Sequence, residues 1–99
     1  MNIHKLMKQA QQMQERMQRE LGELVVEAAA GGGMVKVRMS GHKLVLAVEI
    51  DREVIDPQDP GMLQDLVLLA VNEAGRKVDE AMQSRMGALS GGLPGLGRG

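Results

Sequence analysis

The amino-acid sequence predicts an α+β protein in which one helix is followed by three antiparallel strands and a last helix. Three observations lead to this order. Apolar residues recur every three or four positions at both ends, alternate every second position in the middle, and are interrupted there by glycine-containing turns. The chain has 99 residues, no cysteine and no Phe, Tyr or Trp, so its core contains only aliphatic residues and methionine. Small cores of this kind are commonly completed by association, and we therefore expect an obligate dimer.

The first predicted element is an amphipathic helix that begins after Asn2, a favourable N-cap residue, and ends near Gly22. Its apolar positions fall within about 120° of one another on a helical projection; they are Ile3, Leu6, Met7, Ala10, Met13, Met17 and Leu21. The stripe nearly fits a heptad until Glu20 breaks it, with Ile3, Ala10, Met17 and Leu24 at one core position and Leu6 and Met13 at the other. Because methionine fills irregular gaps, we expect this stripe to pack against the last helix or a partner subunit.

Between residues 23 and 50 the apolar period changes to two, which predicts a three-stranded antiparallel meander with one buried face. The strand candidates are residues 23–30, 34–40 and 44–50, joined by Gly31-Gly32-Gly33 and by a tight connection at Gly41. One face is expected to hold Val35, Val37 and Met39 together with Leu44, Leu46, Val48 and Ile50. On the other face, Lys36 and Arg38 are expected across from Glu27 and Glu49.

The last helix is predicted to start at Asp59-Pro60, an N-cap followed by proline at the first helical position. From Met62 to Val71 it is apolar almost all round, so we expect one side to cover the sheet and Leu66 to Val71 to meet a second subunit. Beyond Asn72 the apolar stripe narrows, which predicts a projecting arm that stops at Gly87. We therefore predict one dimerising domain over residues 1–87 and a flexible Gly-rich tail over residues 88–99.

The net charge of −1 conceals a strongly uneven distribution along the chain. Residues 1–19 carry four cations and one acid, a net charge of +3, whereas residues 49–65 carry six acids and one cation, a net charge of −5. The four cations of the first helix fall within about 80° of each other, opposite the apolar stripe; they are Lys5, Lys8, Arg16 and Arg19. A row of cations about 20 Å long can follow the phosphates of a nucleic acid. A solvated helix face is the other interpretation.

No group of residues in the sequence predicts catalysis, a cofactor or a metal site. His4 and His42 have no partner at metal-ligand spacing, the serines lie in no nucleophile motif, and a strand rather than a helix follows the three glycines. The carboxylates of residues 49–65 do not follow the spacing of a calcium loop. We therefore expect a protein that is not an enzyme, without a small-molecule substrate. No stretch resembles a signal peptide or a membrane span, so the expected location is the cytoplasm.

Five segments in unbroken order resemble the YbaB/EbfC family of small bacterial nucleoid-associated proteins: LMKQAQQMQERMQ (6–18), GGMVKVRMSG (32–41), VEID (48–51), MLQDLVLLAVNEAGRK (62–77) and the closing Met86-Gly87. The resemblance implies a homodimer with helical arms that project like tweezers, bind double-stranded DNA and alter its conformation in the nucleoid. It implies no catalytic activity. The family's DNA contacts are attributed to the arms, which here match Lys8 in the first segment and Arg76 and Lys77 after NEAG. One departure is Gly75, which softens a helix by up to about 1 kcal/mol.

The leading hypothesis is therefore a DNA-binding homodimer with low sequence specificity and strong salt dependence, acting in nucleoid organisation and gene regulation. Its candidate contacts are Lys5, Lys8, Arg16, Arg19, Arg76 and Lys77. The alternative is a protein-binding adaptor, in which the methionine-rich stripe stays accessible as a groove for a partner helix.

Overall fold

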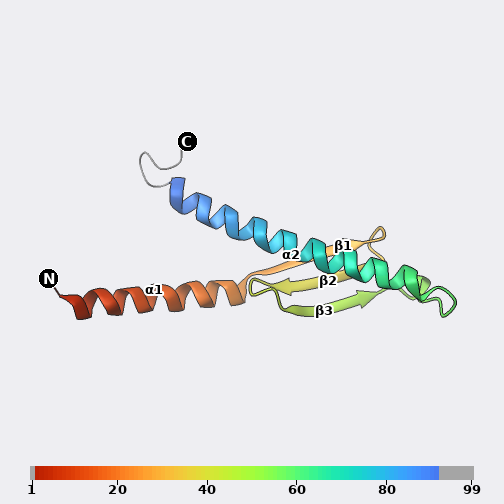
Figure 1. The fold of residues 1–99 in the computed structure, drawn as a ribbon, viewed down its shortest axis with the longest axis horizontal. Helices are drawn as coiled ribbons and strands as arrows, with labels where there is room; N and C mark the ends of the chain where they lie inside the picture. The colour runs from red at the N-terminus through yellow and green to blue at the C-terminus, as the bar shows by residue number, and fades with distance from the viewer. Residues whose placement is uncertain (1, 92–99) are drawn as a thin grey trace.

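The computed structural model describes residues 2–91, except for the side chains of residue 86 and residues 88–91. Its elements are α1 (Ile3–Glu23), β1 (Val25–Ala30), β2 (Val35–Ser40), β3 (Val45–Ile50), the short 3-10 helix η1 (Arg52–Val54) and α2 (Pro60–Gly91). The predicted α-β-β-β-α order is confirmed. Figure 1 shows α2 crossing one face of the sheet, while α1 continues beyond the end of the sheet and diverges from the C-terminal half of α2.

Helix α1 is capped at its start by Asn2 and held to the sheet at its end by Gly41. At its start, the Asn2 side chain accepts a hydrogen bond from the backbone N–H of Lys5 at 3.1 Å, as the sequence predicted. At its end, the Gly41 N–H donates to the carbonyl oxygens of Leu21 and Leu24, each at 3.0 Å. A Cβ atom at Gly41 would lie 2.3 Å from the Leu21 carbonyl oxygen, so only glycine allows this approach. The contact fixes the direction in which α1 leaves the sheet.

The sheet is an antiparallel meander in the order β1-β2-β3. On the face that α2 covers, Val37 lies between Ala28 of β1 and Val48 of β3. On the opposite face, Arg38 is paired with Glu27, and Lys36 is paired with Glu49. Both predicted charge pairings across the strands are therefore confirmed, and they give the uncovered face of the sheet a balanced charge.

The predicted alternation in the third strand is wrong at its start. The register shifts beside Arg38 and Met39, so that Arg38 is paired with Ala47 but Met39 is paired with Val45. This bulge leaves Leu46 without a partner on β2 and turns Val45 toward the face that holds Met39. Leu44, which precedes β3, and Leu46 are 62% and 54% exposed, and they do not join the buried face as expected.

The core lies between α2 and the first two strands. Its sheet side consists of Ala28, Val35, Val37 and Met39, its helix side consists of Ala70, Ala74 and Val78, and Val54 of η1 also belongs to it. The two alanines of α2 allow the helix backbone to approach the sheet closely. The helix begins as predicted at Pro60, where the Asp59 side chain accepts a hydrogen bond from the Met62 N–H at 3.3 Å.

The predicted stop of the last helix at Gly87 is wrong, because α2 continues to Gly91. A single glycine lowers helix stability by about 1 kcal/mol but does not by itself end a helix. The expected Gly-rich tail therefore overlaps α2 at residues 88–91, and the rest of it, residues 92–99, lies outside the described residues.

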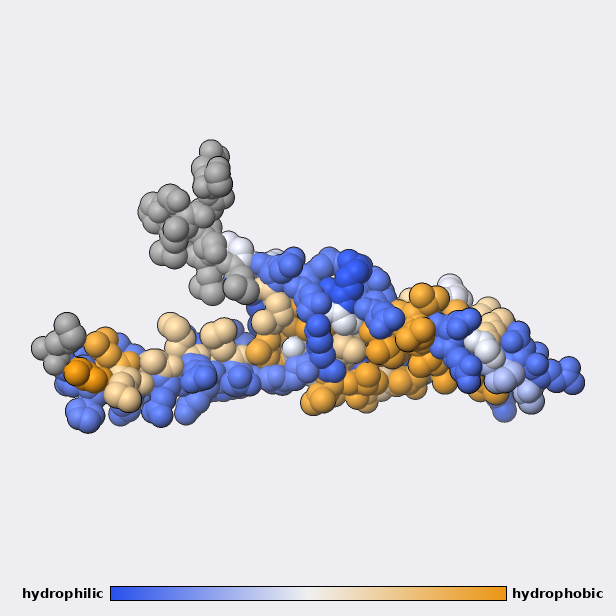
Figure 2. Space-filling model, viewed as in Figure 1, coloured by the Kyte–Doolittle hydropathy of each residue, from blue (hydrophilic) through white to orange (hydrophobic). Residues whose placement is uncertain are grey.

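Helix α2 packs on β1 and β2 but leaves β3 largely uncovered. An open groove runs between the two elements; its lining consists of Ile50, Pro60, Leu63, Gln64, Val67, Leu68 and Val71. We call it the α2–β3 groove. Beside it, Val45 and Val48 are 47% and 44% exposed although they lie on the core face of the sheet. Figure 2 shows apolar atoms gathered over this part of the molecule.

Candidate nucleic-acid interface

The cationic face of α1 stands clear of the rest of the molecule. Lys5, Lys8, Arg16 and Arg19 are all exposed. Among the described residues, none of these four side chains takes part in an ion pair or a side-chain hydrogen bond. Because α1 contacts the sheet only at its base, Lys5, Lys8 and Arg19 line a free rod, and Arg16 also borders a cleft between α1 and α2. Their charge is therefore available to an external anion along the whole row.

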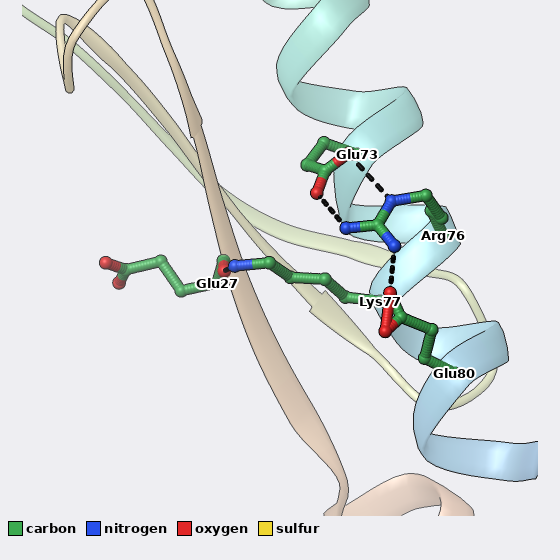
Figure 3. Close-up of polar contacts among 5 residues, drawn as sticks. All are labelled: Glu27, Glu73, Arg76, Lys77 and Glu80. Carbon is green, nitrogen blue, oxygen red and sulfur yellow. Dashed lines mark hydrogen bonds and ion pairs between the residues drawn. The ribbon is translucent and has the colours of Figure 1, made fainter. Parts of the chain in front are cut away.

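Arg76, in contrast, is held by two carboxylates of its own helix (Figure 3). Its Nε atom donates to Glu73 at 3.0 Å, and its terminal nitrogens donate to Glu73 and Glu80. The hydrogen bond with Arg76 lowers the pKa of the Glu73 carboxyl, and the same bond is the main reason that the pKa of Arg76 is raised. One guanidinium facing two carboxylates leaves a local excess of negative charge, which disfavours a phosphate contact at this point.

Lys77 lies on the same turn of α2 but has a different partner. Its Nζ atom donates to the backbone carbonyl of Glu27 at 2.7 Å, so that the side chain reaches over β1 (Figure 3). A carbonyl oxygen does not neutralise an ammonium group, and two of the three N–H donors remain free. The structure therefore fastens Lys77 to the sheet edge without removing its charge.

Two further cations, Lys43 and Arg85, lie close to acids. Lys43 forms an ion pair with Asp79 at 2.8 Å, which joins the β2–β3 turn to α2. This pair was not predictable from the sequence, because 36 positions separate its members along the chain. Arg85 lies 3.9 Å from Glu20, across the gap between the two helices. Uncompensated positive charge is thus concentrated on α1.

The apolar side of α1 is largely uncovered as well. A cleft of about 310 Å³ opens where α1 and α2 diverge, and its lining consists of Met13, Arg16, Met17, Glu20, Leu21, Met82 and Arg85. We call it the arm cleft. Away from its base, the predicted packing of the stripe against the last helix is absent: Ile3, Met7 and Met13 are 63%, 62% and 67% exposed.

Residues 2–91 contain neither a metal-binding cluster nor a membrane-spanning helix. No three histidine, aspartate or glutamate side chains of this region are grouped so that they can hold a metal ion. Neither of its long helices combines the length and the apolar character needed to cross a membrane.

Comparison with known proteins identifies relatives along nearly the whole chain. The model of the YbaB/EbfC DNA-binding family matches residues 1–93. A nucleoid-associated protein of Chloroflexus aurantiacus is 50% identical over 99 residues, which cover 97% of this chain and 99% of the relative. One of Acetivibrio thermocellus is 52% identical over 98 residues, covering 96% and 87%. The crystal structure of an uncharacterized Helicobacter pylori protein matches with a TM-score of 0.72 and 19% identity, covering 87% of this chain and 94% of that one, and this match supports the fold alone.

Proposed function

Because the chain belongs to the YbaB/EbfC DNA-binding family, we propose that it is a nucleoid-associated homodimer that binds double-stranded DNA through the cationic face of α1. The observation that supports this most strongly is the row of four exposed cations on an arm outside a body that carries more acids than cations. The names of relatives that are about half identical support the nucleoid as the place of action. Organisation of the nucleoid and regulation of genes are the roles that such binding would serve.

The spacing of the cations suits a series of phosphate contacts. Lys5 and Arg19 are 14 residues apart, which corresponds to about 21 Å along a helix axis. Lysine and arginine on such a row neutralise phosphates and release condensed counterions, so affinity should fall steeply with salt. Phosphates carry no base identity, and binding through them has low sequence specificity. Any preference among sequences would then come from groove width or from the ease of bending the duplex.

The two candidates on α2 contribute less in this proposal. Arg76 would have to leave Glu73 and Glu80 before it could bind a phosphate, and both carboxylates would repel the DNA. Lys77 keeps its charge and two free donors, so it ranks above Arg76 as a secondary contact. The main interface is therefore assigned to Lys5, Lys8, Arg16 and Arg19.

The homodimer in the proposal is formed through the α2–β3 groove. The buried core of one chain is small, since it contains only alanines, valines and one methionine. At the groove, Leu68 and Ile50 are 58% and 37% exposed, and the core face of β3 has no helix above it. An apolar surface of this continuity is unusual on a monomer and is typical of an association site. A second copy would cover it, in agreement with the expectation for Leu66 to Val71.

Fluorescence anisotropy with duplexes of equal length and different sequence tests the proposal. We expect the dissociation constants of three unrelated duplexes to agree within about tenfold, whereas specific binders exceed their non-specific affinity by about 1,000-fold or more. Replacing Lys5, Lys8, Arg16 and Arg19 by glutamine should abolish binding at physiological salt. A control variant replaces two cations of the body, Lys36 and Arg38, and should bind almost normally. Loss of binding only in the control variant would overturn the assignment to α1.

A further inference from the structure

Helix α1 carries a second apolar surface that is separate from the α2–β3 groove. It consists of Ile3, Leu6, Met7, Ala10, Met13 and Met17, and we call it the arm stripe. Its large side chains are between 52% and 67% exposed. Figure 2 shows that the apolar atoms of α1 gather on the side of the helix turned toward α2. Scattered exposed apolar residues are ordinary, but a continuous stripe along a free helix points to another helix that covers it.

We propose that the arm stripe pairs in antiparallel orientation with α1 of a second copy of this chain, and that the first turn of the partner's α1 enters the arm cleft. The pairing goes beyond DNA binding, because it uses the opposite side of α1. Its first support is the heptad spacing, in which Ile3, Ala10 and Met17 alternate with Leu6 and Met13. This repeat of 3.5 residues keeps one seam of a helix against another helix of the same kind.

The orientation follows from the size and charge of the residues in the seam. A parallel pair in register would place Glu20 against Glu20 of the partner subunit, and Ala10 against Ala10 of the partner subunit. The first contact repels and the second leaves a void. An antiparallel pair with Ala10 facing the partner's Met13 places a small side chain against a large one on both sides of the two-fold axis. Glu20 then lies at the end of the seam, beside Arg85 at 3.9 Å.

The same register predicts which residues of the partner subunit would fill the arm cleft. When Ala10 faces the partner's Met13, Leu6 of the partner subunit faces Met17, and the partner's Ile3 reaches the level of Glu20 and Leu21. The apolar walls of the cleft at this level come from Met17, Leu21 and Met82. A cleft of about 310 Å³ has room for the aliphatic side chains of one helical turn. Each of two copies would fill the cleft of the other, so the contact closes on itself without leaving an open end.

Pairing of the arms leaves three of the four proposed DNA-binding cations accessible. On a helical projection the centre of the arm stripe lies about 155° from the centre of the four cations. Lys5, Lys8 and Arg19 therefore point outward from the pair, and two cationic rows are joined on one rod. Arg16 and Gln9 occupy the heptad position next to the seam, and in the antiparallel pair Arg16 lies opposite Gln9 of the partner subunit. Arg16 therefore does not face another cation across the seam.

Disulfide cross-linking of the full-length protein tests the register directly. The chain has no cysteine, so introduced cysteines are its only thiols. In the double variant Leu6→Cys/Met17→Cys, we expect mild oxidation to link two chains, since the antiparallel seam brings these positions together. The two cysteines of one chain are about 16 Å apart along the helix, too far to join each other. The single variant Leu6→Cys should remain unlinked, because position 6 meets position 6 only in a parallel pair.

A second set of variants tests whether the cross-link depends on the arm stripe or on the charge of α1 in general. Ile3→Glu/Met13→Glu places two acids on the arm stripe, and Gln11→Glu/Gln18→Glu adds the same charge on another side of α1. Placed on the cysteine background, the first pair should abolish the cross-link and the second should leave it in place. All four positions are exposed, so neither change should unfold the chain.

Three results would overturn the proposal: no cross-link in Leu6→Cys/Met17→Cys, an equal cross-link in a Gln11→Cys/Gln18→Cys control, or efficient linking of Leu6→Cys alone. If the cross-link is absent while the unmodified protein still binds duplexes, arm pairing is wrong and the proposed function stands. If the cross-link forms while the protein ignores duplex DNA, the proposed function fails and arm pairing stands. A partner helix from another protein would likewise leave the cysteine variants of the purified chain unlinked.

Discussion

Shortening Leu68 tests whether the α2–β3 groove is the dimer interface. The substitution Leu68→Ala removes three carbon atoms, each of which contributes about 0.8 kcal/mol when it is fully buried. Since 58% of Leu68 is exposed in a single chain, that fraction is what association can still bury. The loss is about 1.4 kcal/mol for each chain and about 2.8 kcal/mol for a two-fold dimer. We therefore expect the dimer dissociation constant to rise about 100-fold.

The adjacent residue provides a matched control. Leu69 is 59% exposed, nearly the same as Leu68, but it points about 100° away around the helix and does not line the groove. Leu69→Ala should change the dissociation constant less than threefold. Sedimentation of both variants over a dilution series measures the two constants. Equal weakening by both substitutions, or no change in either, would refute the assignment of the interface to the groove.

Three further predictions concern single sites. Gly75→Ala should raise the free energy of unfolding by about 0.5–1 kcal/mol in thermal denaturation, because the site is helical and a Cβ there would meet no atom within 4 Å. Gly41→Ala should lower it by at least about 1–3 kcal/mol, because the new Cβ would collide with the Leu21 carbonyl. Arg76→Gln should raise the pKa of Glu73 in an NMR titration, because the hydrogen bond that lowers it is lost. In the unmodified protein that bond stabilises the fold above the ordinary pKa of Glu73 and is lost as the pH falls through the lowered value.

The order of elements was predictable because apolar spacing records which side chains are buried. Val35, Val37 and Met39 alternate in sequence, and all three are buried in the structure. The start of β3 was not predictable in the same way. The run LVLAVEI is apolar at so many positions that either register satisfies the alternation, and the bulge beside Met39 decides between them. A bulge depends on how two strands meet, which the spacing within one strand does not record.

The contacts that hold the candidate cations were predictable from the sequence only where the two residues are close along the chain. Glu73 and Glu80 lie three and four positions from Arg76, a spacing that places them on one side of a helix, and both bind it. The contact of Lys77 with the backbone of Glu27 spans 50 positions and depends on the path of α2 over β1. For the four cations of α1, helical spacing predicted the shared face, and the fold then placed that face on a free arm.

The salt dependence of DNA affinity tests the central claim most directly. Each phosphate contact adds about 0.9 to the slope of log affinity against log salt concentration. Replacing the four cations of α1 by glutamine should therefore flatten the slope by about 3.6 for every arm in contact with the duplex. Replacing Lys36 and Arg38 should leave it unchanged. A slope that stays the same without the four α1 cations would contradict binding through this helix, whatever the affinity at any single salt concentration.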